Sequence, residues 1–390
     1  MTSPHDKRKE VVSSIPKRNL VRAEQVFLTK LKDVTANQVL SILSKRELVK
    51  NCDIDRAEMK LIQEEFSEDK LPEWWNPQIE AKFTVLERIS LEDAFNYIVF
   101  RFKFHHYPRT GQVYDFPQYV LIEPVSSCNL RCPMCFQVDS TFTKKPYMGI
   151  MNLNLFKKVI NECAAGGTGA ITLASRGEPT LHPKLPEMLS YLNGKFFEVK
   201  LITNGTRLNE DLCRSIFKNG IDQIVLSIDS EDPEIFESIR YGADFQTVLK
   251  NVIMLKSIRE REFPNSMTRI RISGVKIIKS QNPTAFKEFW SQYVDEVTMG
   301  GAEERWDTYN NQLHPELTDK CLYPWERLYV WFDGTCNPCD VDYKSFLSPG
   351  KIGESSIRKI WHSNHFKKLR SDHLSGERGK HNPCDRCQVC

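Results

Sequence analysis

The feature that most constrains this fold is the alternation of short β-rich runs with amphipathic helical patterns between about residues 118 and 300. Six runs have the composition of buried parallel strands: "YVLIEP" (119–124), "AITLAS" (170–175), "EVKLITN" (198–204), "QIVLSID" (223–229), "RIRISGVKI" (269–277) and "DEVTMG" (295–300). Helical stretches such as "NLNLFKKVINECAA" separate them. Six βα units predict an α/β protein with a partial (β/α)6 barrel instead of the closed eight-stranded form.

The regions that flank this barrel have different patterns. Residues 1–20 are basic and predict a disordered tail, and residues 21–116 show charged, helical spacing that predicts an N-terminal extension without a chemical motif. We assign residues 117–318 to the barrel and 319–390 to a small cysteine-rich domain. In that last domain "ERLYVWFDGTCNPC" predicts a β-hairpin around an Asp-Gly turn.

Composition and charge exclude several classes of protein. The 390 residues are 40% hydrophobic and 27% charged, and the formal net charge of +3 is too balanced to indicate a nucleic-acid surface. Apolar runs stay well below the roughly 18 residues of a membrane helix, and the N-terminus lacks the apolar core of a signal peptide. We therefore expect a cytoplasmic protein without nucleic-acid or membrane partners.

Twelve cysteines in such a compartment do not predict disulfide bonds, and most of them are clustered. Three fall within "SSCNLRCPMCFQ", and six lie between residues 321 and 390. The scattered ones are expected to be ordinary thiols: Cys52, Cys163 and Cys213.

The first cluster consists of Cys128, Cys132 and Cys135, directly after the first predicted strand. The C-terminal ends of barrel strands are where such enzymes build active sites. Three thiolates can hold three corners of a four-iron, four-sulfur cluster and leave its fourth iron open to another ligand. The alternatives are a zinc site completed by a histidine such as His105 or His106, or three unrelated thiols.

The spacing CxxxCxxC after a first strand resembles the signature of the radical S-adenosylmethionine (SAM) superfamily. In that family the amino and carboxylate groups of SAM chelate the open iron. The segment "SRGEPTLHP" (175–183) is similar to the family's GGEP motif, which implies that Gly177 and Glu178 meet the SAM amino group. "ITNGT" and "LSIDS" resemble its third- and fourth-strand segments and imply further cofactor-binding residues near the ribose and the substrate: Asn204, Ser227 and Asp229.

Two residues depart from the family pattern. Met134 stands where an aromatic residue is usual, and its flexible thioether can still pack against an adenine ring. Arg176 replaces the first glycine of the GGEP motif. It is expected either to pair with a substrate or SAM carboxylate or to be an exposed surface arginine.

The second cysteine group resembles the SPASM/twitch extension of the same superfamily. The resemblance implies one fully ligated auxiliary 4Fe–4S cluster, held by Cys321, Cys339, Cys384 and Cys387. Cys336 and Cys390 are surplus, and each is expected to be an ordinary thiol or to replace one of these ligands. A zinc ribbon is the rival interpretation, because paired CxxC motifs also bind zinc.

The resemblance implies an enzyme that reductively cleaves SAM to a 5′-deoxyadenosyl radical, which abstracts hydrogen from the substrate. The expected substrate is a sugar- or cyclitol-like small molecule whose hydroxyl is oxidised, with the auxiliary cluster as electron acceptor. An electron donor such as flavodoxin or ferredoxin is implied. The alternatives are a maturase that crosslinks or epimerises a ribosomal peptide, and a zinc-binding interaction protein.

Overall fold

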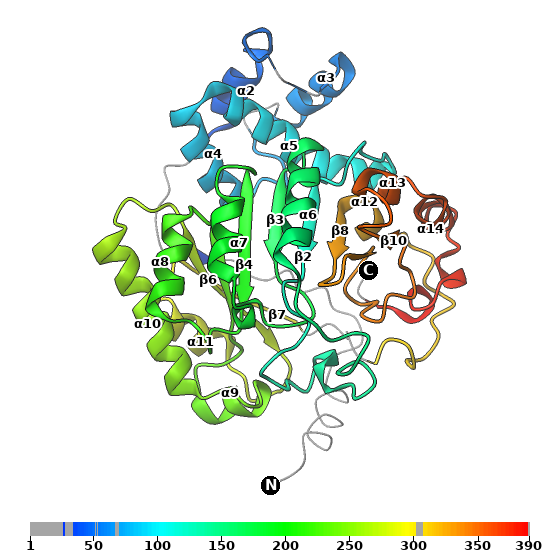
Figure 1. Cartoon of the computed structure of the whole chain (residues 1–390). Coiled ribbons are helices and arrows are strands. Elements are labelled where there is room, and N and C mark those ends of the chain that lie inside the picture. The colour runs from blue at the N-terminus through cyan, green and yellow to red at the C-terminus, as the bar shows by residue number, and fades with distance from the viewer. Residues whose placement is uncertain are drawn as a thin grey trace. The chain divides into compact units, whose positions relative to one another are not determined.

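The computed structural model describes residues 26–27, 34–50, 52, 54–66, 70–301 and 307–388. The chain forms two compact units, Thr29–Tyr114 and a larger one made of Met1–Leu28 and Asp115–Cys390 (Figure 1). The basic tail at residues 1–20 and Cys390 lie outside the described residues. Within the described part of the chain, every helix is too short or too polar to cross a membrane.

A parallel sheet forms the centre of the larger unit, which confirms the predicted α/β class. Its strands are β2 (Tyr119–Ile122), β3 (Ala170–Leu173), β4 (Glu198–Thr203), β5 (Gln223–Ser227), β6 (Arg269–Lys276) and β7 (Glu296–Gly301). They lie in the order β7-β6-β5-β4-β3-β2, and all five neighbouring pairs are parallel. The sheet continues past both edges instead of closing on itself, so the barrel is partial as the six-unit pattern predicts.

Helices follow the strands: α6 (Leu153–Ala165), α7 (Leu185–Leu192), α8 (Glu210–Lys218), α9 (Pro233–Ile239), α10 (Phe245–Glu262) and α11 (Pro283–Trp290). Five of the six begin at an Asn or Asp whose side chain accepts a hydrogen bond from a backbone N–H of the first turn. Such caps satisfy donors that the helix itself leaves unpaired, which fixes where each helix starts.

The two faces of the sheet differ because successive strand residues point to opposite sides. One face contributes apolar residues to the main core with the helices, including Ile171, Leu201 and Ile224. The alternate positions of β4 and β6 are only partly buried, as their periodic burial shows. The sheet therefore buries one face against helices and keeps polar side chains on the other.

The C-terminal region extends the same sheet. The predicted hairpin is present as β8 (Arg327–Val330) and β9 (Thr335–Asn337), with β10 (Gly350–Lys351) beside β9. Gly334 adopts a positive φ of 89° in its turn, a conformation that glycine accepts without strain. Strand β8 also pairs in parallel with β2, a contact that the sequence did not predict (Figure 1).

The larger unit contains further elements, most of which are short. The edge strand β1 (Val26–Phe27) pairs antiparallel with β7. The others are η3 (Phe136–Val138), η4 (Pro179–Leu181), α12 (Tyr323–Glu326), α13 (Ile357–Trp361), α14 (Asn364–Leu374), η5 (Arg378–Lys380) and η6 (Cys384–Arg386).

The smaller unit is helical: α2 (Ala36–Leu43), η1 (Arg46–Leu48), α3 (Arg56–Glu65), α4 (Pro77–Ile89) and α5 (Leu91–Thr110). Capping boxes at Thr35 and Asp55 start α2 and α3. Trp74 and Trp75 pack edge-to-face on Phe66, with ring centroids 5.7 and 5.5 Å away. These buried aromatic rings give the unit a core of its own.

Candidate functional site

The three-cysteine loop lies between β2 and α6, at the C-terminal end of the first parallel strand. Burial raises the pKa of Cys128 to about 11 and that of Cys135 to about 12, and the neighbouring charge of Cys132 adds to both rises. The backbone N–H of Leu130 donates to the Cys128 sulfur over 3.4 Å. Cys132 is buried, Cys128 and Cys135 are partly buried, and the three sulfurs lie within electrostatic range of one another.

This donor set fits an iron–sulfur cluster. Three thiols on one short loop can each bind a different iron, and they become ligands only when a metal displaces their protons. Within the described residues, groups of three or more His, Cys, Asp or Glu side chains suited to a single metal ion are not found.

Gly177 brings the loop after β3 against the cysteine loop. A Cβ atom at this position would lie 2.2 Å from the carbonyl oxygen of Val125 and 2.5 Å from that of Ser127. Both contacts are with backbone, so a larger residue would push the two loops apart. The N–H of Glu178 donates to the Ser127 carbonyl over 2.9 Å and fixes this approach.

Glu178 joins the loops that follow β3 and β4. Its carboxylate accepts hydrogen bonds from the Thr180 hydroxyl and N–H, the Thr203 hydroxyl and the Asn204 N–H, at 2.6 to 3.1 Å. Burial raises the pKa of Glu178, and these four bonds oppose that rise. The Asn204 amide nitrogen lies 3.7 Å from the Cys128 sulfur and 3.0 Å from Asn129 Oδ1. The sequence-predicted Gly177, Glu178 and Asn204 thus all border the cysteine loop.

Asp229 reaches the same loop through Arg240, a residue that the sequence analysis missed. Asp229 is fully buried, and its carboxylate accepts from Arg240 Nε at 2.5 Å and from the Val275 N–H at 2.9 Å. Arg240 Nη1 then lies 3.9 Å from the Cys132 sulfur. The only sequence signal for Arg240 is that a basic residue follows the helix after the fourth predicted strand.

Met134 and Ser227 occupy different surroundings. Met134 packs against a small cluster that contains Ile239 and Ile277. Ser227 ends β5, pairs with Ser273 of β6 and stays partly exposed on the face away from the helices.

Ser175, in the loop just after β3, is a second residue that the sequence analysis passed over. Its φ is 106°, a left-handed conformation that is rare for residues other than glycine. Its buried hydroxyl lacks a hydrogen-bond partner among the described residues. Strained backbone and an unpaired polar atom tend to occur together at ligand sites, so this position fits a bound cofactor.

The structure corrects the expectations for Arg176. It is 2% exposed, so it is not a surface arginine, and it binds the chain's own Glu123 through two 2.6 Å contacts instead of reaching for a ligand. Its third nitrogen donates to the Tyr343 carbonyl at 2.8 Å, and its guanidinium lies 4.1 Å from the Trp331 ring centroid. Glu123 is fully buried, and a buried carboxylate requires such a partner. Arg176 therefore ties the loop after β3 to the C-terminal region.

The second cysteine group comes together from distant segments. Burial raises the pKa of Cys339, and nearby Asp342, Cys384 and Cys387 raise it further, so these thiols are close neighbours. Arg378, 1% exposed, donates to the carbonyls of Asp319, Cys384 and Cys387 at 2.9 to 3.3 Å. One guanidinium thus fastens the segment before Cys321 to the segment that carries the final CxxC.

His373 lies beside Cys321. Its Nδ1 accepts the Cys321 N–H at 3.1 Å, which places the proton of the neutral ring on Nε2. Burial lowers the pKa of His373 to about 4, so the ring is neutral near pH 7. Nε2 is buried and lacks an acceptor in the described part of the chain. A donor of this kind beside the cysteine group fits the sulfur atoms of a bound cluster.

Three other cysteines occupy the main core, whereas Cys52 is partly buried in the smaller helical unit. Cys163, Cys213 and Cys336 are buried in the main core among apolar residues. Cys336 belongs to β9, and its sulfur lies 3.8 Å from the Gly334 carbonyl. This placement is that of an ordinary core thiol.

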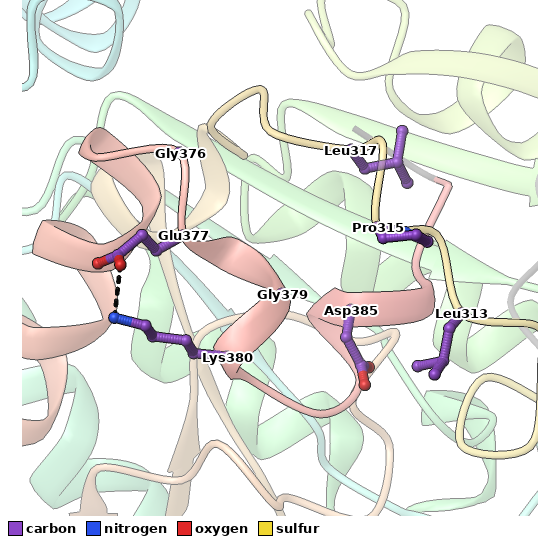
Figure 2. Close-up of a pocket in the computed structure, with 8 residues that line it drawn as sticks. All are labelled: Leu313, Pro315, Leu317, Gly376, Glu377, Gly379, Lys380 and Asp385. Carbon is purple, nitrogen blue, oxygen red and sulfur yellow. Dashed lines mark ion pairs between the residues drawn. The ribbon is translucent and has the colours of Figure 1, made fainter.

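A cavity of about 370 Å³ lies next to the C-terminal segment, lined by Leu313, Pro315, Leu317, Gly376, Glu377, Gly379, Lys380 and Asp385 (Figure 2). An ion pair of 2.6 Å joins Glu377 and Lys380 at its edge (Figure 2). None of its lining residues belongs to the three-cysteine loop, so we do not assign the chemistry to this cavity.

Comparison with known families gives two matches. The radical SAM superfamily matches residues 122–275, and an iron–sulfur cluster-binding domain named SPASM matches residues 321–390. The matched ranges contain the first and the second cysteine group, respectively.

Individual relatives are more distant. A tungsten-containing aldehyde ferredoxin oxidoreductase cofactor-modifying protein from Pyrococcus furiosus is 30% identical over 29% of this chain, and the match spans 31% of that protein. A GTP 3′,8-cyclase from Mannheimia succiniciproducens is 30% identical over 63% of this chain and 71% of its own length. Among solved structures, SuiB from Streptococcus suis, bound to S-adenosylmethionine, has a TM-score of 0.54 at 13% identity, with 80% of this chain and 87% of SuiB covered. That likeness shows a shared fold.

Proposed function

Because the chain belongs to the radical SAM superfamily and carries a C-terminal SPASM domain, we propose that it oxidises a hydroxyl group of a sugar- or cyclitol-like small molecule. Its cofactors are SAM, a SAM-binding 4Fe–4S cluster and auxiliary iron–sulfur chemistry in the SPASM domain. When bound, they supply reductive cleavage of SAM and hydrogen abstraction, so that alcohol and SAM yield carbonyl product, 5′-deoxyadenosine, methionine and one proton.

The residues around the three-cysteine loop are proposed to bind SAM and its 4Fe–4S cluster. Cys128, Cys132 and Cys135 bind three irons. Gly177 and Glu178 line the position of the SAM amino group, with Glu178 oriented by its four donors. Around them, Asn204, Ser227 and Asp229 line or support the cofactor and substrate positions, and Met134 offers a thioether to the adenine.

The arrangement of the second cysteine group is the observation that carries the oxidation proposal. Cys339 neighbours Cys384 and Cys387, and Arg378 and His373 hold the segment that carries Cys321. Four thiolates saturate a 4Fe–4S cluster, so such a cluster offers no iron to a substrate. Its proposed task is to accept the electron that the substrate loses when an alcohol becomes a carbonyl, while an external flavodoxin- or ferredoxin-like donor supplies the first cluster.

Anaerobic reconstitution followed by a substrate screen tests the proposal. We expect a brown protein with about eight irons per chain and 5′-deoxyadenosine formation that sugars or cyclitols stimulate, with a carbonyl product formed in equal amount. A colourless, zinc-loaded protein would favour the zinc interpretation. Stimulation by peptides alone, with a crosslinked or epimerised product, would favour the maturase interpretation and contradict alcohol oxidation.

A second candidate is a reaction on a nucleotide. The GTP 3′,8-cyclase of Mannheimia succiniciproducens is 30% identical to this chain, and the match spans 71% of the cyclase. Nucleoside triphosphates therefore belong in the same screen. GTP-dependent 5′-deoxyadenosine formation without a carbonyl product would favour this candidate.

A further inference from the structure

The sheet face that turns away from the helices carries basic side chains where barrel interiors usually hold branched apolar ones. The strand residues that alternate with the core positions include Lys200, Gln223, Arg269, Arg271 and Glu296. These side chains come from four neighbouring strands, β4 to β7.

Strand register brings these side chains into two adjacent rows. Lys200 of β4 pairs with Gln223 of β5, which pairs with Arg269 of β6. Arg271 of β6 pairs with Glu296 of β7. Directly paired residues on one face lie about 5 Å apart, so Arg269 and Arg271 gather around one buried carboxylate, and Lys200 lies on the same face two strands from Arg269.

Arg271 occupies the centre of this cluster. Its Nε lies 3.4 Å from Glu296 Oε1, and its Nη2 donates to the Thr298 hydroxyl at 2.9 Å. Arg269 reaches the other oxygen of Glu296 at 3.7 Å, and the Gln223 amide donates to that same oxygen over 3.5 Å. Glu296 is fully buried, whereas the Arg269 and Arg271 side chains keep 15% and 18% of their surface. Arg269 Nε and Nη2 and Arg271 Nε are themselves buried, so water or a ligand can contact only the remaining atoms of these two side chains.

The electrostatics favour an added anion. Burial lowers the pKa of both Arg269 and Arg271, and the charge of Arg269 lowers that of Arg271 further, while Glu296 opposes these shifts. Like charges held together away from bulk water destabilise each other, and an anionic group placed among them offsets that cost.

We propose that Arg271, together with Arg269 and Lys200, binds an anionic group of the substrate, a carboxylate or a phosphate. The inference rests on the proposed function and narrows its substrate to acidic molecules. Arginine suits this task because its planar fork donates two parallel hydrogen bonds to either oxyanion.

The position of Arg271 matches that task. Ser227 and Ser273 pair at the end of β5, and Arg271 lies two residues earlier on β6, roughly 7 Å below them. An anion held there would leave the rest of a small molecule pointing toward the strand ends, where the cysteine loop lies. The length of a sugar ring is comparable with that separation.

Anion-dependent thermal stability tests the proposal without turnover. Unfolding temperatures of the reconstituted protein are measured at constant ionic strength while chloride is replaced by inorganic phosphate or by acetate. A ligand that binds the folded state stabilises it in a saturable manner. We expect such a rise for the wild type, and the anion that produces it distinguishes a phosphate site from a carboxylate site.

Variants assign the effect to the cluster. Arg271→Gln should weaken the apparent anion affinity about tenfold or more, because a charge-assisted hydrogen-bonding partner is lost. Lys200→Met leaves the ion pairs of Glu296 intact and should weaken the apparent anion affinity several-fold. This variant provides the test if Arg271→Gln folds poorly. Arg214→Gln, an arginine in exposed ion pairs with Glu210 and Glu262, is the matched control and should respond as the wild type does.

Two results would overturn the anion site. One is a wild-type anion response in Arg271→Gln or Lys200→Met, and the other is the absence of a saturable response to both anions in the wild type. Either result leaves the proposed oxidation intact, because that function is judged by 5′-deoxyadenosine and carbonyl formation in a separate assay.

Discussion

The two cysteine groups differ in how the chain assembles them. Cys128, Cys132 and Cys135 lie within eight residues on one loop, and the loops after β3 and β4 hold that loop from the side through Gly177 and Glu178. The second group takes its thiols from segments more than 60 residues apart, and Arg378 fastens them through three backbone carbonyls.

This difference teaches that the same ligand chemistry can rest on local or on tertiary structure. A site within one loop forms wherever the strand that precedes it forms. A site joined across distant segments closes long loops, so its metal also stabilises the fold around it. The first group should therefore tolerate changes in the C-terminal region better than the second group tolerates changes in the barrel.

Removing a ligand of the local group should produce the largest effect. Cys132→Ala is expected to reduce 5′-deoxyadenosine formation to background, because an incomplete cluster cannot anchor SAM. The measurement is 5′-deoxyadenosine by chromatography in the presence of reductant. Cys213→Ala, which alters a core thiol, is the control and should retain formation; near-normal formation by Cys132→Ala would refute the assignment of this loop.

Removing two ligands of the second cysteine group should distinguish the function of that group from the function of the first. Cys384→Ala with Cys387→Ala is expected to stop product formation while abortive 5′-deoxyadenosine is still made, since the SAM-binding loop does not depend on those thiols. Iron content, melting behaviour and both products are measured together. Full turnover in a folded double variant would show that these cysteines hold no electron acceptor.

Removing Arg176, which joins the loop after β3 to the C-terminal region, should lower the free energy of unfolding. Arg176→Gly restores the glycine usual at this position in the family and leaves buried Glu123 without its bidentate partner. Loss of one partner of a buried pair costs about 3–5 kcal/mol. Denaturant unfolding should report that loss, and Arg176→Gly with Glu123→Gln should recover part of it. Equal stability of the wild type and Arg176→Gly would contradict the role of this pair.

Glu178→Gln should have a smaller effect, confined to the local group. The amide NH2 group of glutamine would face a donor that now binds a carboxylate oxygen and cannot accept its hydrogen bond, so SAM affinity should fall about tenfold with iron content unchanged. Equilibrium binding of SAM to the reconstituted variant measures this. Iron loss with unchanged SAM affinity would assign Glu178 to the cluster instead.

Met134→Leu should have the smallest effect, because the swap nearly conserves volume within its apolar cluster. The free energy of unfolding should change by less than about 1.5 kcal/mol. A larger loss in thermal or chemical unfolding would show that the thioether has a specific partner.

Much of the fold was predictable from local pattern. The six strands and the β8–β9 hairpin follow from runs of β-branched residues and an Asp-Gly turn, which are properties of adjacent residues. The parallel pairing of β8 with β2 was not, because register between distant segments leaves no local signal. The bidentate partner of Arg176 was missed for the same reason, since Glu123 lies 53 residues earlier in the chain.

The candidate site divides in the same way. Gly177, Glu178 and Asn204 were singled out by their motifs, and the structure brings them to the cysteine loop. The sequence does not reveal the residues that act through tertiary contacts. Arg240 contacts Cys132, 108 positions away, and His373 contacts Cys321, 52 positions away. Arg378 binds several backbone carbonyls at once.

The central claim is that the two groups hold separate clusters, of which only the local one has an iron open to SAM. Electron paramagnetic resonance of the reduced Cys384→Ala, Cys387→Ala double variant, with and without SAM, tests it most directly. We predict that about four irons per chain remain and that SAM changes the remaining cluster signal. A variant that loses all its iron, or a remaining signal that SAM leaves unchanged, would contradict the claim.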